Sequence, residues 1–390
     1  MFSTYIVREN STLEKNITCL IFNDCFNLKL YPGDIPNSVI YLTLGHYFNR
    51  SLKPGIIPNS VTHLTFGNDF NKLLKPGDIP NSVKALYFGN NFNQPLKPGV
   101  IPDSVNIIYF EQNFNQPLKP RDIPYSVTCL TFDEWFNRPL GFVPPCVTHL
   151  KFGRQFNQRL NPGDIPNSVT HLEFGQYFNQ ILEPGAIPNS VTRLKFGISF
   201  NKLLKSGSIP NSVTHLNLGW NDKLLEPGFI PNSVTHLTLG RNFNQILNPG
   251  DIPNSVTHLV FGYWFNRPLK IGIIPDSVTH LVFGKKFNRQ LEPGHIPNSV
   301  IYLKFGKKFN QILKPGDIPS SVIFMRIDSL DYFSDSIFIK CNDFSRGKWT
   351  IYNCKYIGNK KLYQDIFISK INSGILSNIP HELSCYLLEY

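Results

Sequence analysis

Histidines recur along the chain at intervals close to multiples of 22 residues. Imidazole nitrogens bind zinc and titrate near neutral pH, so such a set could form a metal site or a pH switch. No cysteine or carboxylate accompanies these histidines at a fixed spacing. We therefore expect no metal site and attribute the pattern to duplication of a repeat. The histidines concerned are His63, His149, His171, His215, His236, His258 and His280.

Aromatic and basic residues follow the same interval towards the C-terminus. Between residues 239 and 322 there are ten Lys and Arg residues against four Asp and Glu residues. Exposed aromatic side chains beside positive charge are typical anchors of protein interfaces. We expect this region to bind a protein partner, and its charge favours an acidic one. The candidate binding residues are Tyr263, Trp264, Lys285, Lys286, Lys304, Lys307 and Lys308, with Trp135 as a further exposed anchor.

Catalytic chemistry finds little support in the sequence. Carbohydrate-cleaving enzymes need paired carboxylates in a groove, whereas the acids here mainly follow a turn glycine, as Asp78 follows Gly77. Nucleotide-binding glycine motifs, H-E-x-x-H and G-x-S-x-G are absent from the sequence. We predict a non-enzymatic protein without cofactors. The first alternative is a carbohydrate-active enzyme on a parallel β-helix, an architecture that a 22-residue coil also suits. The second is nucleic-acid binding through the basic C-terminal coils, supported only by the net charge of +11.

The element that must position these residues is a repeat. The dipeptide Phe-Asn and the dipeptide Ile-Pro alternate along most of the chain, and nearly every interval within each series is 22 residues. One repeat, from Val61, reads VTHLTFGNDFNKLLKPGDIPNS. We number coil positions from this valine as position 1.

Each repeat predicts one short strand and one irregular return leg. Leu64 and Phe66 alternate with polar residues, as in a strand with one buried face, so positions 3, 5, 8 and 9 should point outward. Pro76, Gly77 and Pro80 exclude a helix from the return leg. Successive strands should pair in parallel about 4.8 Å apart. The predicted fold is a mainly β, leucine-rich-repeat-like solenoid with one parallel strand per 22-residue coil and non-helical return legs. We expect the protein partner to bind the exposed face of its parallel sheet.

The asparagine of each Phe-Asn pair predicts a structural ladder. It follows the strand, where backbone amides lose their partners in the sheet and need other acceptors. We expect Asn244 to be such a rung and the neighbouring Gln245 to be exposed and dispensable.

At these residues the sequence resembles the FNIP repeat family, which is grouped with leucine-rich repeats and is abundant in social amoebae and amoeba-infecting giant viruses. The resemblance covers roughly residues 17–322. It implies a solenoid with a protein-binding role. Some members carry an F-box before the repeats; with about sixteen residues ahead of the first strand, we expect none here.

The predicted organisation has three parts. Residues 1–16 form an N-terminal cap, residues 17–322 a solenoid of about fourteen repeats, and residues 323–390 a C-terminal cap or small β-rich module. In the last part, SIFIKC, KWTIYNCKYI and DIFISKI are predicted strands and HELSCYLLEY a short helix. The seven cysteines include no C-x-x-C pair, and the sequence has no signal peptide or long apolar segment. These features predict an intracellular, cytoplasmic protein (host-cell cytoplasm if viral) with no membrane association.

Three places depart from the repeat. The segment GFVPPC is two residues short, and Trp220-Asn221-Asp222 replaces Phe-Asn with one residue missing. In the third place, Glu111 and Asp133 replace the glycine that follows the strand in two consecutive repeats, and Arg121 replaces the return-leg glycine between them. We expect a local bulge, hinge or kink at each.

Overall fold

The computed structural model describes residues 4–7, residues 16–328 apart from 224, 226, 227, 312 and 315, and residues 336–343 and 348–352. These residues form eighteen strands, and no helix occurs among them. The strands are β1 (Thr4–Val7), β2 (Cys19–Phe22), β3 (Tyr41–Thr43), β4 (His63–Thr65), β5 (Ala85–Phe88), β6 (Ile107–Phe110), β7 (Cys129–Phe132), β8 (His149–Lys151), β9 (His171–Glu173), β10 (Arg193–Lys195), β11 (His215–Asn217), β12 (His236–Thr238), β13 (His258–Val260), β14 (His280–Val282), β15 (Tyr302–Phe305), β16 (Phe324–Asp328), β17 (Ser336–Asp343) and β18 (Lys348–Tyr352).

All the strands belong to one sheet. Strands β1 to β16 pair in parallel with their neighbours in chain order, so that Leu216 stands beside Leu237 and Leu237 beside Leu259. The predicted parallel solenoid of about fourteen turns, about 22 residues apart and without helices, is thereby confirmed. The parallel ladder continues through β16, and β17 and β18 then add to it in antiparallel fashion.

The predicted C-terminal elements are only partly within the described chain. SIFIKC lies inside β17 and the first residues of KWTIYNCKYI form β18. DIFISKI and HELSCYLLEY lie outside the described residues. In the described part of the chain, no helix is long and apolar enough to cross a membrane.

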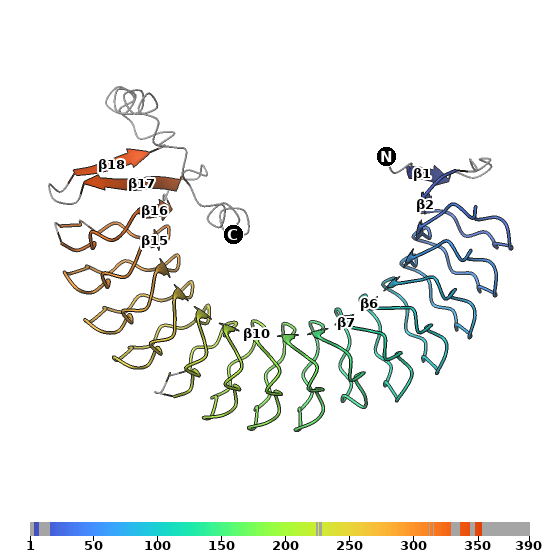
Figure 1. Ribbon diagram of the computed structural model, residues 1–390, viewed down its shortest axis with the longest axis horizontal. Coiled ribbons are helices and arrows are strands. Elements are labelled where there is room, and N and C mark those ends of the chain that lie inside the picture. The colour runs from blue at the N-terminus through green and yellow to red at the C-terminus, as the bar shows by residue number, and fades with distance from the viewer. Residues whose placement is uncertain are drawn as a thin grey trace.

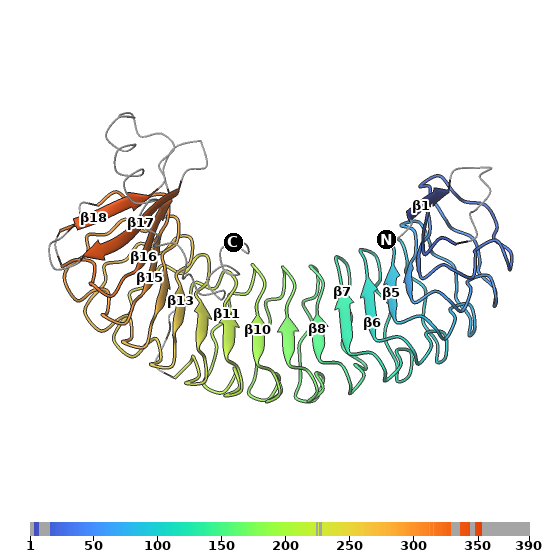
Figure 2. The ribbon, with the colours of Figure 1, turned by 45° about the horizontal axis from the view of Figure 1, so that its top comes forward.

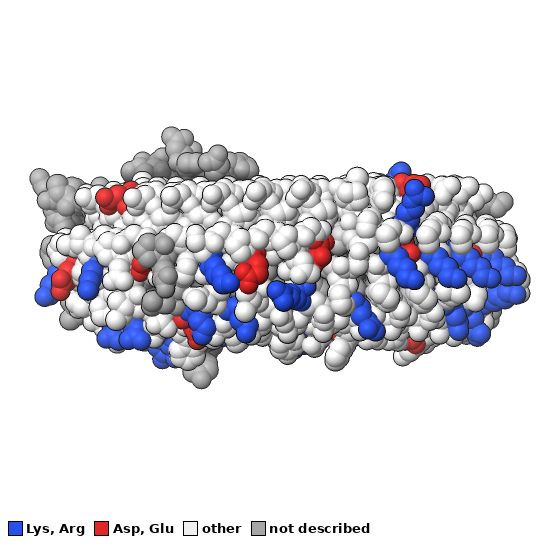
Figure 3. Space-filling view, turned by 90° about the horizontal axis from the view of Figure 1, so that it is seen from below, with Lys and Arg blue, Asp and Glu red and all other residues white. Residues whose placement is uncertain are grey.

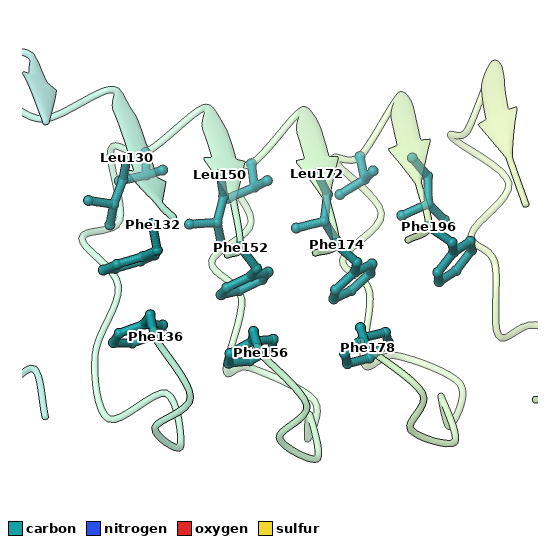
Figure 4. Close-up of a cluster of buried hydrophobic side chains, with 14 of the residues drawn as sticks. Leu130, Phe132, Phe136, Leu150, Phe152, Phe156, Leu172, Phe174, Phe178 and Phe196 are labelled. Atoms are coloured by element: carbon teal, nitrogen blue, oxygen red, sulfur yellow. The ribbon is translucent and has the colours of Figure 1, made fainter. Parts of the chain in front are cut away.

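The core consists of stacked side chains from equivalent positions. Val, Leu and Phe at positions 1, 4, 6 and 10 are almost completely buried, as Val61, Leu64, Phe66 and Phe70 illustrate. Figure 4 shows Leu130, Phe132 and Phe136 stacked against their counterparts on the following coils. A single coil could not bury these residues alone, so the stack itself closes the core.

The return leg is fixed by its turn residues. Gly77 has a φ of +91°, a conformation that glycine adopts without strain. The next residue, Asp78, accepts a hydrogen bond from the backbone N–H of Lys75 at 2.7 Å on its Oδ2 atom. Equivalent aspartates repeat this turn in other coils. The acids of the return leg therefore serve as turn caps.

The solenoid is curved, with the strands on its inner face (Figures 1 and 2). The distance between equivalent rings on adjacent coils increases from the strand face to the phenylalanines behind it. Imidazole centroids on the sheet face are 4.1 Å apart between His215 and His236. Phe261 and Phe283 at position 6 are 5.2 Å apart, and Phe265 and Phe287 at position 10 are 6.1 Å apart. Because each coil is thinner at the strand than at the phenylalanine behind it, stacking of such wedges bends the array into an arch.

The departures from the repeat leave the ladder continuous. Strands β7 and β8 pair in register across the two-residue deletion, and β11 and β12 pair in register across the one-residue deletion beside Trp220. Arg121 keeps the turn conformation of the glycine it replaces, with a φ of +69°. The expected bulges are therefore absorbed outside the strands within the described array.

Candidate functional site

An aromatic–cation column runs along the loops that follow strands β11 to β14. The guanidinium of Arg241 lies between two rings, with its Cζ atom 4.7 Å from the centroid of Trp220 and 4.9 Å from that of Tyr263. The Nζ atom of Lys285 lies 5.4 Å from the Tyr263 centroid. Cations are attracted to aromatic faces by the ring quadrupole. Aromatic rings and positively charged side chains thus alternate over four consecutive coils.

A second pair stands beside this column at position 9. The Nζ atom of Lys286 lies 4.8 Å from the centroid of Trp264, whose side chain is 47% exposed. Backbone hydrogen bonds hold these loops in register: the N–H of Trp264 donates to the carbonyl of Arg241 at 3.0 Å, and the N–H of Lys286 to that of Tyr263 at 2.9 Å. The loops are therefore stacked as regularly as the strands.

The structure brings most of the predicted binding residues together. Tyr263, Trp264, Lys285 and Lys286 form the column and its side pair. Lys307 and Lys308 are exposed on the next coil, where the N–H of Lys308 donates to the carbonyl of Lys285 at 3.0 Å. Lys304 is half-buried on β15, beside Val282 of β14. Trp135 follows β7, on a different part of the arch.

Sequence reasoning missed two members of the column, Trp220 and Arg241. Both stand at position 8, where Tyr263 and Lys285 were already noted, so extension of that position backwards would have found them. The deletion beside Trp220 obscured the equivalence. Asn221 turns inward in place of the usual phenylalanine; it is buried, and its Oδ1 accepts a hydrogen bond from the N–H of Lys223 at 2.7 Å.

The charge of the column is not neutralised within the described chain. No ion pair there involves Arg241, Lys285, Lys286, Lys307 or Lys308. Near β8, a comparable contact between an arginine and a tyrosine has its positive charge neutralised by an acid. There Arg154 lies 5.4 Å from the Tyr177 centroid, but it also pairs with Glu134 at 3.0 Å. The C-terminal column therefore retains its positive field, which can attract an anionic partner.

The histidines form a stacked ladder on the inner sheet face. The four rings from His215 to His280 have centroids 4.1–4.2 Å apart. Each ring also contacts the hydroxyl of the preceding threonine, as with Thr235 and the Nδ1 atom of His236 at 2.9 Å. Because the Thr235 hydroxyl donates to the carbonyl of Thr214 at 3.2 Å, we assign the proton to Nδ1 of His236. Nε2 is then the acceptor nitrogen of the His236 ring.

Stacking half-buries these histidines, which the sequence predicted to be simply outward-facing. Burial lowers the pKa of His215 and of His258 to about 4, and neighbouring histidines add to the effect. Burial also lowers the pKa of His236 and His280. The ladder is therefore neutral at pH 7. No group of three or more His, Cys, Asp or Glu side chains in the described chain is placed to hold a metal ion.

Two acids stand on adjacent coils at the glycine position. Burial, followed by the charge of Asp133, raises the pKa of Glu111. The Tyr109 hydroxyl donates a hydrogen bond to Asp133 at 3.4 Å. Burial, followed by the same carboxylate, raises the pKa of Tyr109. These acids lie at the end of the strands, outside the aromatic–cation column.

The outer face carries a second positive feature that sequence reasoning missed. Figure 3 shows Lys and Arg gathered over the N-terminal coils, at the right-hand end of the view. Four exposed lysines occupy the same return-leg position on consecutive coils. They could have been found by reading position 15 down the repeats. These lysines are Lys53, Lys75, Lys97 and Lys119.

Comparison with known proteins agrees with this architecture. The chain is similar to the solved structure of CroV588, described as a novel circular leucine-rich-repeat protein, from a giant virus. The sequences are 32% identical, the TM-score is 0.60, and the match covers 81% of this chain. The chain spans 57% of the length of CroV588. Among curated proteins, none matches the chain significantly.

A sequence model of the FNIP repeat matches the chain eight times. The matched segments are residues 9–47, 26–69, 70–113, 114–143, 136–177, 178–221, 220–264 and 265–308. Together they cover most of the solenoid, including the loops that carry the aromatic–cation column. The resemblance inferred from the Phe-Asn and Ile-Pro marks is thereby confirmed. The chain belongs to the FNIP repeat family.

Proposed function

We propose that the protein is a non-enzymatic scaffold that binds an acidic protein segment through the loops following β11 to β15. The observation that carries this proposal is the aromatic–cation column, with its unpaired positive charges beside an exposed tryptophan. A rigid solenoid suits such a role, because stacking fixes side chains from distant parts of the sequence in one row.

Affinity and association rate should come from different residues. Trp264 is a large ring that is 47% exposed, and it can bury apolar area against a partner. Of the neighbouring lysines, Lys285, Lys307 and Lys308 are exposed and Lys286 is half-buried. Each single charge should therefore contribute less than about 1 kcal/mol. Their joint field should mainly accelerate association. An acidic segment with at least one aromatic or aliphatic side chain is the partner that this surface fits best.

The proposal can be tested with a fluorescently labelled peptide of twenty residues that contains glutamates and two leucines. Anisotropy titrations would compare it with a lysine-containing peptide of equal length and with a single-stranded oligonucleotide. We expect the acidic peptide to bind most tightly. Stronger binding of the oligonucleotide, with a steep loss of affinity in salt, would favour nucleic-acid recognition instead.

Matched tryptophan variants localise the site. Trp264→Ala should weaken peptide binding by about 2 kcal/mol, which is roughly thirtyfold. Trp135→Ala is the control, because Trp135 occupies the same coil position and is similarly exposed, at 52%. Reversal of Lys285, Lys286, Lys307 and Lys308 to glutamate should slow association and flatten its salt dependence. Unchanged binding in both sets of variants would exclude this surface.

A further inference from the structure

A separate groove runs along the N-terminal half of the array. It has a volume of ≈ 610 Å³ and opens to solvent, a size within the range of small-molecule sites. Its lining comes from positions 9 and 11 of successive coils. We call the position-11 residues the amide floor (Asn49, Asn71, Asn93 and Asn115) and the position-9 residues the polar wall (Asp69, Asn91, Asn113 and Trp135).

The amide floor presents hydrogen-bond donors in a fixed orientation. The Oδ1 atom of Asn71 accepts the N–H of Asn93 at 3.0 Å and the side chain of Gln94 at 2.9 Å. The Oδ1 atom of Asn93 does the same for the next coil. Since each oxygen is engaged with the backbone, the orientation of the amide is determined, and its NH₂ group has no protein partner among the described residues. The floor is a row of free N–H donors.

The polar wall supplies acceptors in the same groove. Asn91 donates from Nδ2 to Oδ1 of Asp69 at 2.9 Å, and Asn113 donates to Oδ1 of Asn91 at 2.8 Å. Oδ2 of Asp69 and Oδ1 of Asn113 make no further hydrogen bond within the described chain. The wall is therefore pre-organised by its own ladder and ends in the exposed ring of Trp135.

The chemistry of this lining selects among ligands. The lining contains no cation, and the Asp69 carboxylate disfavours an anion. It offers no apolar pocket for the side-chain anchors of a peptide. A hydroxyl group is both donor and acceptor, so paired N–H donors and oxygen acceptors suit it. An exposed indole ring can pack against the C–H face of a pyranose.

We propose that this groove binds a neutral oligosaccharide, laid along the solenoid with its hydroxyl groups between the amide floor and the polar wall and one sugar ring against Trp135. Phenylalanine rings directly before the floor residues stack at 6.1–6.3 Å, so the donors repeat at a similar spacing. A linear glycan can therefore contact several coils at once. This proposal is independent of the protein-binding column and requires no cleavage of the sugar.

Calorimetric titration with three neutral hexasaccharides, cellohexaose, maltohexaose and hexa-N-acetylchitohexaose, provides the test. At least one should bind saturably. Trp135→Ala and Asn91→Leu should each weaken its binding at least about fivefold, the effect of losing a ring contact or a polar contact. Trp264→Ala and Asn242→Leu are the matched controls, because they alter the same coil position outside the groove, and they should bind as the unaltered protein does.

The outcomes separate this proposal from the previous one. Thermal melting of each variant confirms that it is folded before binding is compared. No binding of any of the three sugars, or binding that survives both groove substitutions, would overturn the proposal. Tighter binding of hexagalacturonate than of the neutral sugars would also overturn it, since it would indicate an anion site. The effect of Trp264→Ala on binding of the acidic peptide is measured separately and tests only the protein-binding column.

Discussion

Removal of one rung from the asparagine ladder should expose a single backbone amide and destabilise the coils on either side. In the ladder, Oδ1 of Asn244 accepts the N–H of Asn266 at 2.9 Å. Asn244→Ala leaves that N–H without a protein acceptor, which costs about 1–3 kcal/mol when the group is buried. Because both asparagines are only half-buried, water can reach the amide, and we expect about 1–2 kcal/mol.

The matched control is Asn242→Ala, two residues earlier. Asn242 is exposed, and its side chain has no hydrogen bond among the described residues, so its loss should change stability by less than about 0.5 kcal/mol. Gln245 is unsuitable as a control. Contrary to the expectation from sequence, it is half-buried, and its Nε2 donates to the carbonyl of Asp222 at 3.0 Å.

Two assays measure the effect. Thermal unfolding should show a midpoint lower by about 2–4 °C for Asn244→Ala and by less than about 1 °C for Asn242→Ala. Hydrogen exchange should increase at the Asn266 amide and in adjacent coils, because each coil of a solenoid contacts only its neighbours. Equal melting shifts in the two variants, or unchanged protection of Asn266, would refute the structural role of the ladder.

Three further predictions concern other parts of the framework. The pKa of His215 and His258 is lowered from 6.5 to about 4, so the unfolded chain binds more protons than the folded chain between these pH values. The stabilisation from the neutral histidines should be complete above about pH 6.5 and decrease towards pH 4. In a variant with both histidines changed to Asn, the melting temperature should depend less on pH in that window. Arg121→Gly should raise stability by about 0.5–1 kcal/mol, because a left-handed conformation is costly for a residue with a Cβ atom, and urea unfolding should show no gain if this strain is absent. Gly284→Ala should cost about 3 kcal/mol or more, since the added Cβ would overlap the carbonyl oxygen of Gly262; a loss no larger than that of exposed Lys285→Ala would contradict the close stacking.

Much of the fold could be predicted because one pattern is repeated many times. Leu64 and Phe66 indicate a strand weakly in isolation, but their recurrence in register specifies both the strand and its pairing partner. Pro76 and Gly77 likewise excluded a helix from the return leg. Their equivalents recur in other coils. These inferences depend only on local conformational limits and on the period.

Curvature and burial of the histidines could not be predicted in the same way. The bend depends on the difference between 4.1 Å stacking at His215 and 6.1 Å stacking at Phe265. Neither distance is set by residue type alone. The tight stacking on the concave side half-buries rings that a flat sheet would leave exposed, and this lowers their pKa. The effect arises from the packing of many coils, which a single repeat does not contain.

The two candidate sites show how one framework can carry opposite chemistries. The core and turn positions carry the same residue types in nearly every coil, whereas the residue type at position 9 varies from coil to coil. It holds Asn91 and Asn113 in the groove and Trp264 and Lys286 in the basic region. Because stacking places equivalent residues side by side, a site emerges wherever compatible residues occupy the same position in consecutive repeats. Substitution there changes the surface without disturbing the ladder beneath it. Functional sites in this chain should therefore be sought by reading one coil position down the array, as the alternation of rings and charges through Trp220 and Arg241 demonstrates.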